Sequence, residues 1–413
     1  MNRVLNDYTP VVGENSISQL CQLAEELRGA SVVHVNSTKV GGGVAEILGW
    51  LVPLMNDLGL DTSWEVVDGN PDFFHVTKSF HNALQGNPLP LSRRMLDTYE
   101  ETLVGNAERL RPILEEADYV FIHDPQPAGL FDLCPNRKGI WIWRCHIDVS
   151  HPNRKYWSYL RSLVMHYHAS IFSMPDFAQP LPHPQVIIAP SIDPLSDKNC
   201  ELSPDEIDSA LRRLGIPDDL PLLTQISRFD RFKDPVGVIE AYKLLAESIK
   251  TRLVMAGGGA TDDPEGAAVL EEVNDAANGN GGYIHILELP SDAHRTINAL
   301  QRASTIVIQK STKEGFGLTV TEAMWKSRPV IGGNVGGIRM QVHNHHTGFL
   351  VNTPQGAALR IQEMLRNPAA MDRMGRQACQ FVTENFLLNR HLREYLTLML
   401  GVRRGLANHL IAQ

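Results

Sequence analysis

The sequence predicts an α/β protein built from two doubly wound domains, each with a parallel sheet. A chain of 413 residues is too long for one ordinary hydrophobic core. Short β-branched runs alternate with amphipathic stretches, which is typical of parallel strands connected by helices. The alternation occurs twice, and residues 190–206 between the two series are rich in Pro, Ser and Asp, as a linker would be.

The first series begins with a predicted strand at residues 31–38, followed by Gly41, Gly42 and Gly43 and a predicted helix at 44–60. These glycines lack the GxGxxG spacing of a dinucleotide site, so a tight turn and a ligand contact both fit them. Further strands are predicted at residues 119–124, 139–148, 169–174 and 185–190.

The second series contains predicted strands at residues 222–228, 252–259, 283–289, 304–310 and 328–333, and residues 386–413 are predicted to be helical. The expected domains are therefore 1–195 and 196–384, followed by C-terminal helices at 385–413. Ligands of such sheets bind beyond the carboxyl ends of the strands, and a cleft between the two domains is the expected place.

Composition narrows the class of protein. A net charge of −9 disfavours a nucleic-acid partner, because no basic patch offsets it. No apolar run approaches the about 18 residues that a membrane helix needs, and the N-terminal residues lack the apolar segment of a signal peptide. The five cysteines are scattered, which predicts free thiols in a reducing compartment and a cytoplasmic protein without a membrane partner.

The stretch KEGFGLTVTEA, residues 313–323, places two carboxylates around a glycine turn. It follows a β-branched strand and leads into a helix, so Glu314 precedes the turn and Glu322 is expected at the helix start. Glycines allow a ligand to approach the backbone, and the first N–H groups of a helix can bind an anion. A solvated loop glutamate and a helix-start glutamate, favoured by the helix dipole, are the alternative explanation.

The stretch SRFDRFKDP, residues 227–235, carries Arg228, Arg231 and Lys233 after a predicted strand. Such a cluster in an acidic protein indicates an anion site, although a loop neutralised by Asp230 and Asp234 would look the same.

Together with the 313–323 helix start, this cluster could hold one diphosphate from two sides. Glu322 would then accept hydrogen bonds from a ribose diol and Glu314 from the hydroxyls of a sugar, which indicates a nucleotide-sugar.

The histidines give weaker signals. His123 and His146 end predicted strands at the expected site, where donation to a ligand and ordinary loop hydrogen bonding are both open. Residues 166–168 (His-Tyr-His) are expected on a helix, in a packing or surface role. No metal site is expected at His343, His345 and His346, because no spaced Cys or carboxylate partner accompanies them.

Several motifs together resemble the retaining glycosyltransferases of family GT4, which have the GT-B fold of two Rossmann-like domains facing a central cleft. EGFGLTVTEA is similar to the E-x7-E signature of that family, SRFDRFKDP to its donor-phosphate loop, and residues 336–351 (GGIRMQVHNHHTGFLV) to its closing segment. The segments HVNSTKVGGGVAEIL, HDPQP and WRCHID further resemble the trehalose-forming branch, the trehalose glycosyltransferring synthases.

The resemblance implies roles for individual residues. Arg228 and Lys233 would neutralise the leaving diphosphate, Glu314 would hold the transferred glucose, Glu322 the ribose, and His146 would contact the glucosyl unit. Further donor contacts are implied at Gly42, Gly43, Leu287 to Leu289 beside the base, and the loop residues Gly315, Phe316, Gly317, Leu318 and Thr319.

The implied activity is synthesis of α,α-trehalose from ADP- or UDP-glucose and free glucose, in a reversible reaction. The resemblance also implies that the C-terminal helices return to the first domain, and that no cofactor or metal is required. Stimulation by Mg²⁺ and formation of a homodimer are left open. Lys310-Ser311 stands where many relatives carry Pro-Ser, which fits the trehalose-forming branch.

Other functions remain in competition at this point. A retaining trehalose phosphorylase would use free phosphate, and a sucrose or sucrose-phosphate synthase would differ only in its acceptor. A nucleotide-sugar sensor with a decayed site is disfavoured by the intact basic pair and glutamates, and a dehydrogenase by the missing GxGxxG.

Overall fold

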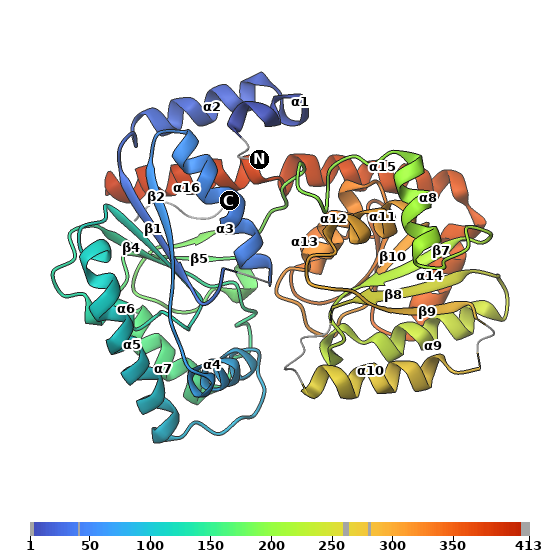
Figure 1. Ribbon diagram of the computed structural model, residues 1–413, viewed down its shortest axis with the longest axis horizontal. Helices are drawn as coiled ribbons and strands as arrows, with labels where there is room; N and C mark the ends of the chain where they lie inside the picture. Colours follow the sequence, from blue (N-terminus) through green and yellow to red (C-terminus); the bar gives the residue numbers. More distant parts are fainter. Residues whose placement is uncertain (1–3, 40–41, 259–263, 280–281, 406–413) are drawn as a thin grey trace. The chain divides into compact units, whose positions relative to one another are not determined.

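The computed structural model describes residues 4–39, 42–258, 264–279 and 282–405. The chain forms two compact units (Figure 1): the first unit comprises Met1–Pro190 and Leu388–Gln413, and the second unit comprises Ser191–Leu387. Each unit has a six-stranded sheet in which all neighbouring strands are parallel, with helices between the strands. The predicted α/β fold class is confirmed.

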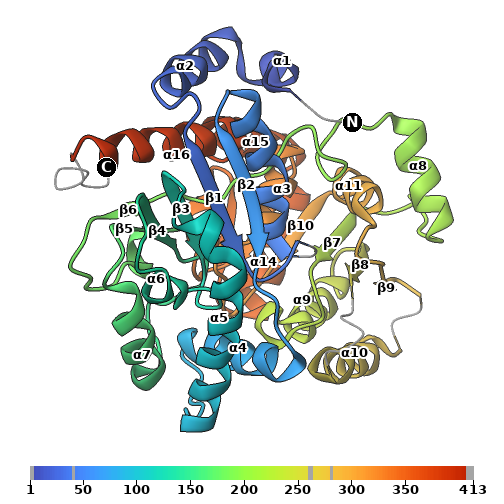
Figure 2. The ribbon, with the colours of Figure 1, turned by 60° about the vertical axis from the view of Figure 1, so that its left-hand side comes forward.

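The sheet of the first unit has the strand order β2-β1-β3-β4-β5-β6. Its strands are β1 (Ser31–Asn36), β2 (Asp61–Val66), β3 (Tyr119–His123), β4 (Ile140–Arg144), β5 (Ala169–Phe172) and β6 (Gln185–Ile187). Strand β2 was not expected: it lies at the sheet edge beside β1 (Figure 2), and its sequence DTSWEV is only partly buried, so it lacks a continuous apolar run.

The helices of the first unit include one from the far end of the chain. They are η1 (Leu5–Tyr8), α1 (Thr9–Val12), α2 (Glu14–Glu25), α3 (Gly42–Asp57), α4 (Pro71–Leu84), α5 (Arg93–Leu114), α6 (Leu130–Leu133), α7 (Arg154–Val164), η2 (Pro175–Phe177) and α16 (Leu388–Arg403). Helix α16 packs on α2 and α3, and Tyr119 Oη of β3 donates to the backbone carbonyl of Met399, 3.2 Å away.

One helix is shorter than expected. Helix α7 ends at Val164, so His166, Tyr167 and His168 lie in the connection to β5 rather than on a helix. The reason is a pair of hydrogen bonds to β4: His168 N donates to the Trp141 carbonyl, and Trp141 N donates to His168 Nδ1, both at 2.9 Å.

The sheet of the second unit has the order β12-β11-β10-β7-β8-β9. Its strands are β7 (Leu222–Ile226), β8 (Arg252–Gly257), β9 (Ile284–Glu288), β10 (Ile306–Gln309), β11 (Val330–Gly333) and β12 (Gly348–Val351). Strand β12, which was not predicted, is four residues long and pairs with β11 at the sheet edge.

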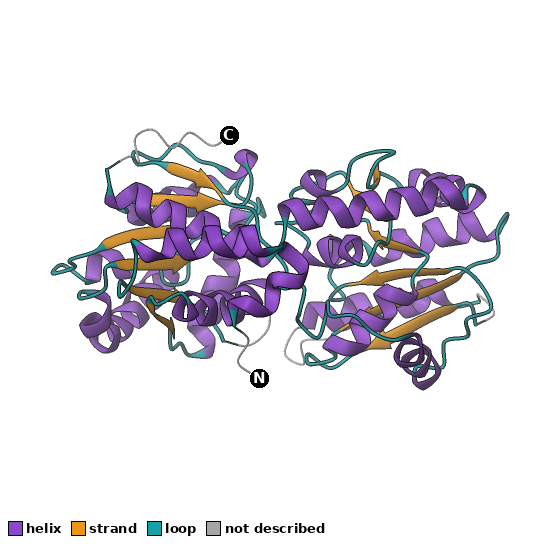
Figure 3. Ribbon diagram, turned by 90° about the horizontal axis from the view of Figure 1, so that it is seen from above, coloured by secondary structure: helices purple, strands orange, loops and turns teal. Residues whose placement is uncertain are grey.

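Helices cover both faces of this sheet (Figure 3). They are α8 (Pro204–Arg213), η3 (Arg231–Lys233), α9 (Pro235–Ala246), α10 (Pro264–Ala277), α11 (His294–Ala303), α12 (Leu318–Trp325), α13 (Ile338–Gln341), α14 (Pro354–Arg366) and α15 (Pro368–Asn385). Alternate residues of the strands enter two cores: Leu223 and Leu253 pack with α9 and α14, whereas Leu222 and Val254 pack with α8 and α11. The sheet is therefore doubly wound.

Each strand order reverses at one point, and this positions the candidate site. In the second unit the chain proceeds from β7 through β8 to β9 and then continues on the other side of β7 with β10. The same reversal separates β1 and β3 in the first unit. The connections after β7 and β10, and those after β1 and β3, therefore leave the sheets at the points where ligands of such folds bind.

Candidate active site

Lys233 and Glu314 meet in the second unit, at the reversal between β7 and β10. Lys233 Nζ donates to Glu314 Oε2 across 2.5 Å, and the two side chains are 19% and 12% exposed. Lys233 ends η3 in the connection after β7, and Glu314 lies in the connection after β10. The structure thus brings together two residues that are 81 positions apart in the sequence.

Hydrogen bonds to its backbone carbonyls hold the Lys233 loop against β7 and against the Glu314 loop. Gln225 Nε2 donates to the Lys233 carbonyl at 2.8 Å, and Thr312 N donates to the Phe232 carbonyl at 2.8 Å. Asp234 has a left-handed φ of 50° and caps α9 by accepting from Gly237 N at 3.2 Å. The loop after β7 therefore ends at the cap of α9, and this cap fixes the position of its last residue.

Asp234 also forms an ion pair with buried Lys310 Nζ. The partner of Asp234 is therefore Lys310 at the end of β10 and not Lys233, as a self-neutralised loop would require. In the sequence, Lys310 is only a departure from the family pattern. In the structure, its buried ammonium group pairs with the residue that caps α9.

The basic cluster after β7 divides into separate contacts. Arg228, whose side chain is 61% exposed, pairs with Asp230 at 3.1 Å, which is the partner that the loop-neutralisation alternative gives it. Arg231 pairs with Glu272 of α10 through both guanidinium Nη atoms, at 3.0 and 2.6 Å, and is 56% exposed. Arg231 therefore has a carboxylate partner from α10, outside the loop, and the anion-binding role of the cluster stays a prediction.

Glycines allow the Glu314 loop to be close-packed. A Cβ on Gly336 would lie 1.7 Å from the Glu314 carbonyl oxygen, and one on Gly337 would lie 2.5 Å from Phe316 Cα. Gly317 has φ +86° and caps α12 in the left-handed region. These positions need glycine for space or for backbone conformation, so the GFG and GG stretches shape this loop.

The segment Gly315–Thr319 leads into α12, which begins at Leu318. The buried side chain of Gln341 holds this segment: its Nε2 donates to the Phe316 carbonyl at 2.7 Å, and its Oε1 accepts from Thr321 Oγ1 at 2.6 Å. The first N–H groups of a helix have no partner within the helix, and an anion can bind there. The expectation that Glu322 begins this helix is wrong, because the helix starts four residues earlier at Leu318, directly after the left-handed cap residue Gly317.

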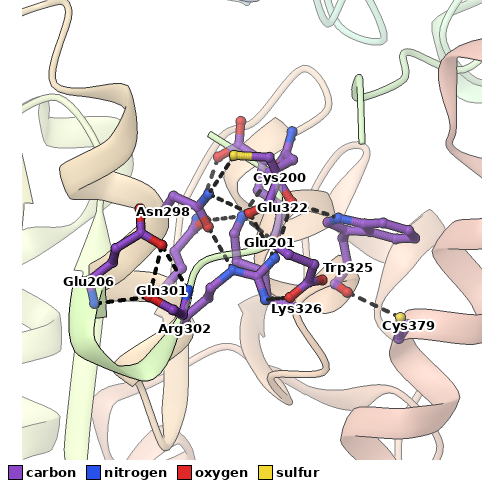
Figure 4. A network of polar contacts seen from close by, with 12 residues as sticks. Cys200, Glu201, Glu206, Asn298, Gln301, Arg302, Glu322, Trp325, Lys326 and Cys379 are labelled. Atoms are coloured by element: carbon purple, nitrogen blue, oxygen red, sulfur yellow. Dashed lines mark hydrogen bonds and ion pairs between the residues drawn. The ribbon is translucent and has the colours of Figure 1, made fainter. Parts of the chain in front are cut away.

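Glu322 lies on the buried side of α12 and is only 2% exposed. Gln301 Nε2 donates to Glu322 Oε2 at 3.4 Å, and Lys198 Nζ lies 3.9 Å from Glu322 Oε1. Figure 4 shows Glu322, Gln301 and Lys326 in one network of polar contacts. A carboxylate in this position can receive further donors at its remaining lone pairs.

Lys326 anchors this network from one turn further along the chain. Its buried ammonium donates to Gln301 Oε1 at 2.7 Å, Asn199 Oδ1 at 2.9 Å and the Glu322 carbonyl at 3.1 Å. Burial lowers the pKa of Lys326 to about 7, and the nearby Glu322 charge opposes that shift. Sequence reasoning missed Lys326, Gln301 and Lys198; the i,i+4 spacing of Glu322 and Lys326 was the available signal.

Leu289 follows β9 at the same edge of the sheet. Its backbone N–H donates to the Gly257 carbonyl at 2.8 Å, and a Cβ on Gly257 would lie 1.8 Å from the Ser227 carbonyl oxygen. Leu289 is buried. The carboxyl ends of β7, β8 and β9 are therefore close together, with Leu289 as an apolar element near them.

The remaining predicted residues belong to the first unit. Gly42 begins α3 with a left-handed φ of +81°, and no atom lies within 4 Å of an added Cβ, so conformation rather than space requires glycine; Gly43 follows within the helix. His146 lies after β4, and its Nε2 is 3.0 Å from Nδ1 of His123 at the end of β3.

Asp124 connects these strand ends through its side-chain carboxyl group. It adopts a left-handed φ of 63°, and its Oδ1 accepts from His146 N at 2.7 Å. Burial raises the pKa of Asp124 to about 7, against the lowering effects of the His146 N–H and the Arg144 charge.

Comparison with known proteins shows the family. Residues 34–179 match the family described as trehalose synthase, N-terminal domain, and residues 206–381 match glycosyl transferases group 1. A trehalose synthase of Pyrococcus horikoshii is 44% identical over 402 residues, which is 96% of each chain. A trehalose phosphorylase of Pleurotus pulmonarius is 27% identical over 84% of this chain and 54% of its own length.

The fold also matches solved structures. An α,α-trehalose-phosphate synthase (UDP-forming) from Burkholderia xenovorans, in complex with glucose-6-phosphate, has a TM-score of 0.72 at 13% identity and covers 90% of this chain and 100% of its own. Among the described residues, no helix combines the length and apolar character needed to span a membrane. The chain therefore belongs to the trehalose synthase family, and it is a trehalose-related glycosyltransferase with the GT-B fold.

Proposed function

We propose that this protein transfers glucose from a nucleotide-glucose to free glucose and so forms α,α-trehalose. The bond between the glucosyl anomeric carbon and the diphosphate oxygen breaks, and a bond to the anomeric oxygen of the acceptor forms. The hydroxyl proton of the acceptor leaves with the nucleoside diphosphate, so the reaction balances without a redox partner.

The observation that supports this proposal is the Lys233–Glu314 pair beside the start of α12, with Glu322 one turn into the helix. A cation and the N–H groups from Gly315 to Thr319 suit a diphosphate, while the carboxylates suit the hydroxyls on either side of it. The leaving diphosphate gains charge as the glycosidic bond breaks, so cationic groups fixed at this position accelerate the reaction.

We assign the roles as follows. Lys233 and Arg228 bind the diphosphate, Glu314 holds the transferred glucose, and Glu322 accepts from the ribose. Leu289 lies by the base, and His146, Gly42 and Gly43 contact the donor from the first unit. The structurally similar trehalose-phosphate synthase of Burkholderia xenovorans is described as UDP-forming, which supports a nucleotide leaving group. Its complex with glucose-6-phosphate supports a sugar acceptor.

A trehalose phosphorylase is the second candidate, since one of the relatives has that name. Inorganic phosphate would then take the position of the nucleotide phosphate at Lys233. Glu322 separates the two candidates, because a phosphorylase has no ribose for this carboxylate to bind.

The test is an assay with defined donors and acceptors, followed by NMR identification of the product. ADP-glucose, UDP-glucose and glucose-1-phosphate are each combined with glucose, glucose-6-phosphate or fructose. Formation of α,α-trehalose from a nucleotide-glucose and glucose is expected. Turnover with glucose-1-phosphate alone would support the phosphorylase, and a sucrose product would reject both candidates. Because the proposed reaction includes no metal, the activity should persist in EDTA, and a parallel series with Mg²⁺ measures any stimulation.

A further inference from the structure

Three histidines form a continuous chain across three neighbouring strands of the first unit. His34 lies in β1, His123 ends β3 and His146 follows β4, and these strands are adjacent in the order β1-β3-β4. His34 Nδ1 is 3.0 Å from His123 Nε2, and His123 Nδ1 is 3.0 Å from His146 Nε2. Each contact is short enough to need a hydrogen, so one ring of each pair must donate.

The surroundings keep the three rings uncharged. Burial lowers the pKa of His34 to about 3. Burial also lowers the pKa values of His123 and His146 well below the usual range, and the neighbouring histidines and Arg144 add to that lowering. The charged and titratable groups that face the chain are Arg144 of β4, His391 and Tyr395 of α16, and Asp124, whose carboxyl group accepts from the His146 backbone N–H. At neutral pH each ring therefore carries one hydrogen.

A chain of three neutral imidazoles has two possible orders of hydrogens. In one, each ring donates toward His146, which then carries its hydrogen on Nδ1. In the other, each ring donates toward His34, which then carries a hydrogen on Nε2. The two orders differ at the ends of the chain, so the environment of the end rings selects between them.

The buried end decides the order. His34 Nε2 is buried and has no hydrogen-bond partner among the residues that the structure describes. His34 also stacks on Phe121, with ring centroids 4.8 Å apart. Orphaned N–H donors are rarer in protein interiors than acceptors with an unused lone pair. This favours the order in which His34 Nε2 carries no hydrogen.

We propose that His34 and His123 are positioning residues that hold His146 as its Nδ1–H tautomer, a neutral hydrogen-bond donor for the sugar substrate. His34 Nδ1–H donates to His123 Nε2, and His123 Nδ1–H donates to His146 Nε2. His146, which is only partly buried, keeps its Nδ1–H outside the chain. The role toward the sugar rests on the proposed function, whereas the order of hydrogens does not.

The first test is ¹⁵N NMR of the full chain labelled at histidine, at pH 7.5 and without substrate. The His34, His123 and His146 signals are assigned with single His→Gln variants. His146 should show a protonated Nδ1 and an unprotonated Nε2, and His34 should show an unprotonated Nε2. A protonated Nε2 on His146, or a charged ring in the chain, would overturn the proposal whatever reaction the enzyme catalyses.

The second test compares two substitutions at His34. His34→Phe keeps an aromatic ring beside Phe121 but removes the donor, whereas His34→Asn keeps an amide N–H near the position of Nδ1. His34→Phe should mix the His146 tautomers and lower kcat about tenfold, the effect of one neutral hydrogen bond lost in the transition state. The KM for the donor sugar should change less.

His34→Asn should restore the His146 tautomer and most of kcat, which a purely structural role of the ring would not produce. Near-UV circular dichroism checks the packing of both variants. If His34→Phe mixes the tautomers and kcat stays unchanged, the role of the chain in transfer is rejected while the hydrogen order stands. If the wild type transfers no glucose at all, the proposed function fails and the NMR result is unaffected.

Discussion

Lys233 Nζ donates a hydrogen bond to Glu314 Oε2 at 2.5 Å, so the cation assigned to the diphosphate is held by the carboxylate assigned to the sugar. Both side chains are largely removed from solvent, and each satisfies the charge of the other. Under the proposed roles, a donor would place its phosphate beside Lys233 and its hydroxyls beside Glu314. We therefore expect donor binding to exchange this ion pair for two contacts to the ligand.

Glu314→Gln should separate the two roles. The amide keeps the shape of the side chain but no longer holds Lys233 as an ion pair, so ADP or UDP should bind at least as well as in the wild type. The loss of the charged acceptor for the glucosyl hydroxyls should lower kcat by roughly tenfold or more, since hydrogen bonds to charged groups contribute about 1.5–3 kcal/mol. Calorimetry with the nucleotides and steady-state kinetics measure the two effects.

The matched control for this variant is Glu272→Gln, which breaks the exposed pair with Arg231 on the same unit. It should leave both nucleotide affinity and kcat close to wild type. Tenfold weaker nucleotide binding by Glu314→Gln would contradict the exchange of the ion pair.

Lys233→Ala and Arg228→Ala should each lower kcat by roughly 10²- to 10³-fold, the usual effect of removing a group that stabilises transition-state charge. Arg231→Ala is the control, because Arg231 belongs to the same loop but pairs with Glu272. Kinetics of the three variants at saturating donor give the comparison. Equal decreases of kcat in Lys233→Ala and Arg231→Ala would indicate that the loop has only a general structural role.

Glu322→Ala should weaken nucleotide binding by roughly 10- to 150-fold, because a charged acceptor for the ribose diol is lost. Glu322 is buried, so thermal unfolding is measured in parallel and Glu322→Gln serves as the variant that keeps the side-chain volume. Calorimetry against ADP and UDP gives the affinities. If both variants bind nucleotides like the wild type while remaining folded, Glu322 is not the ribose ligand. If the wild type itself binds neither nucleotide, the phosphorylase becomes the better-supported function.

The sequence predicted the fold class because buried parallel strands appear as continuous apolar runs, such as YVFIH and IVIQ. The edge strand β2 escaped prediction because it is only partly buried and carries two carboxylates, so it lacks a continuous apolar run. Strand β12 is apolar and mostly buried, but it is only four residues long and lies in the segment 336–351, which was interpreted as a family motif.

The site was predicted less completely than the fold. Glycine spacing and charge identified the loops that contain Lys233 and Glu314, but their contact depends on β7 and β10 being neighbours, which follows from the strand order. The Gln301–Lys326 network and the histidine chain likewise join residues on separate elements. Periodicity and local motifs describe one element at a time, so contacts between elements remain beyond them.

Acid should destabilise the first unit through its buried histidines. The pKa of His34 is about 3 in the folded chain, whereas an unfolded histidine has a pKa of about 6.5. The folded state therefore has its full stability above pH 6.5, and stability is lost as the pH falls from 6.5 toward 3, because the unfolded chain binds one more proton over that range. At pH 5 the loss from His34 alone is about 2 kcal/mol, since each pKa unit corresponds to about 1.4 kcal/mol.

His34→Phe should remove this contribution and so reduce the difference in unfolding free energy between pH 7.5 and pH 5 by about 2 kcal/mol relative to wild type. Tryptophan fluorescence during urea unfolding reports mainly on the first unit, which contains five of the six tryptophans: Trp50, Trp64, Trp141, Trp143 and Trp157. His75→Phe, at an exposed position of α4, is the control and should keep the wild-type pH dependence. The same pH dependence in His34→Phe and wild type would mean that His34 is not held neutral in the folded protein, which would also remove the basis for a chain of neutral rings.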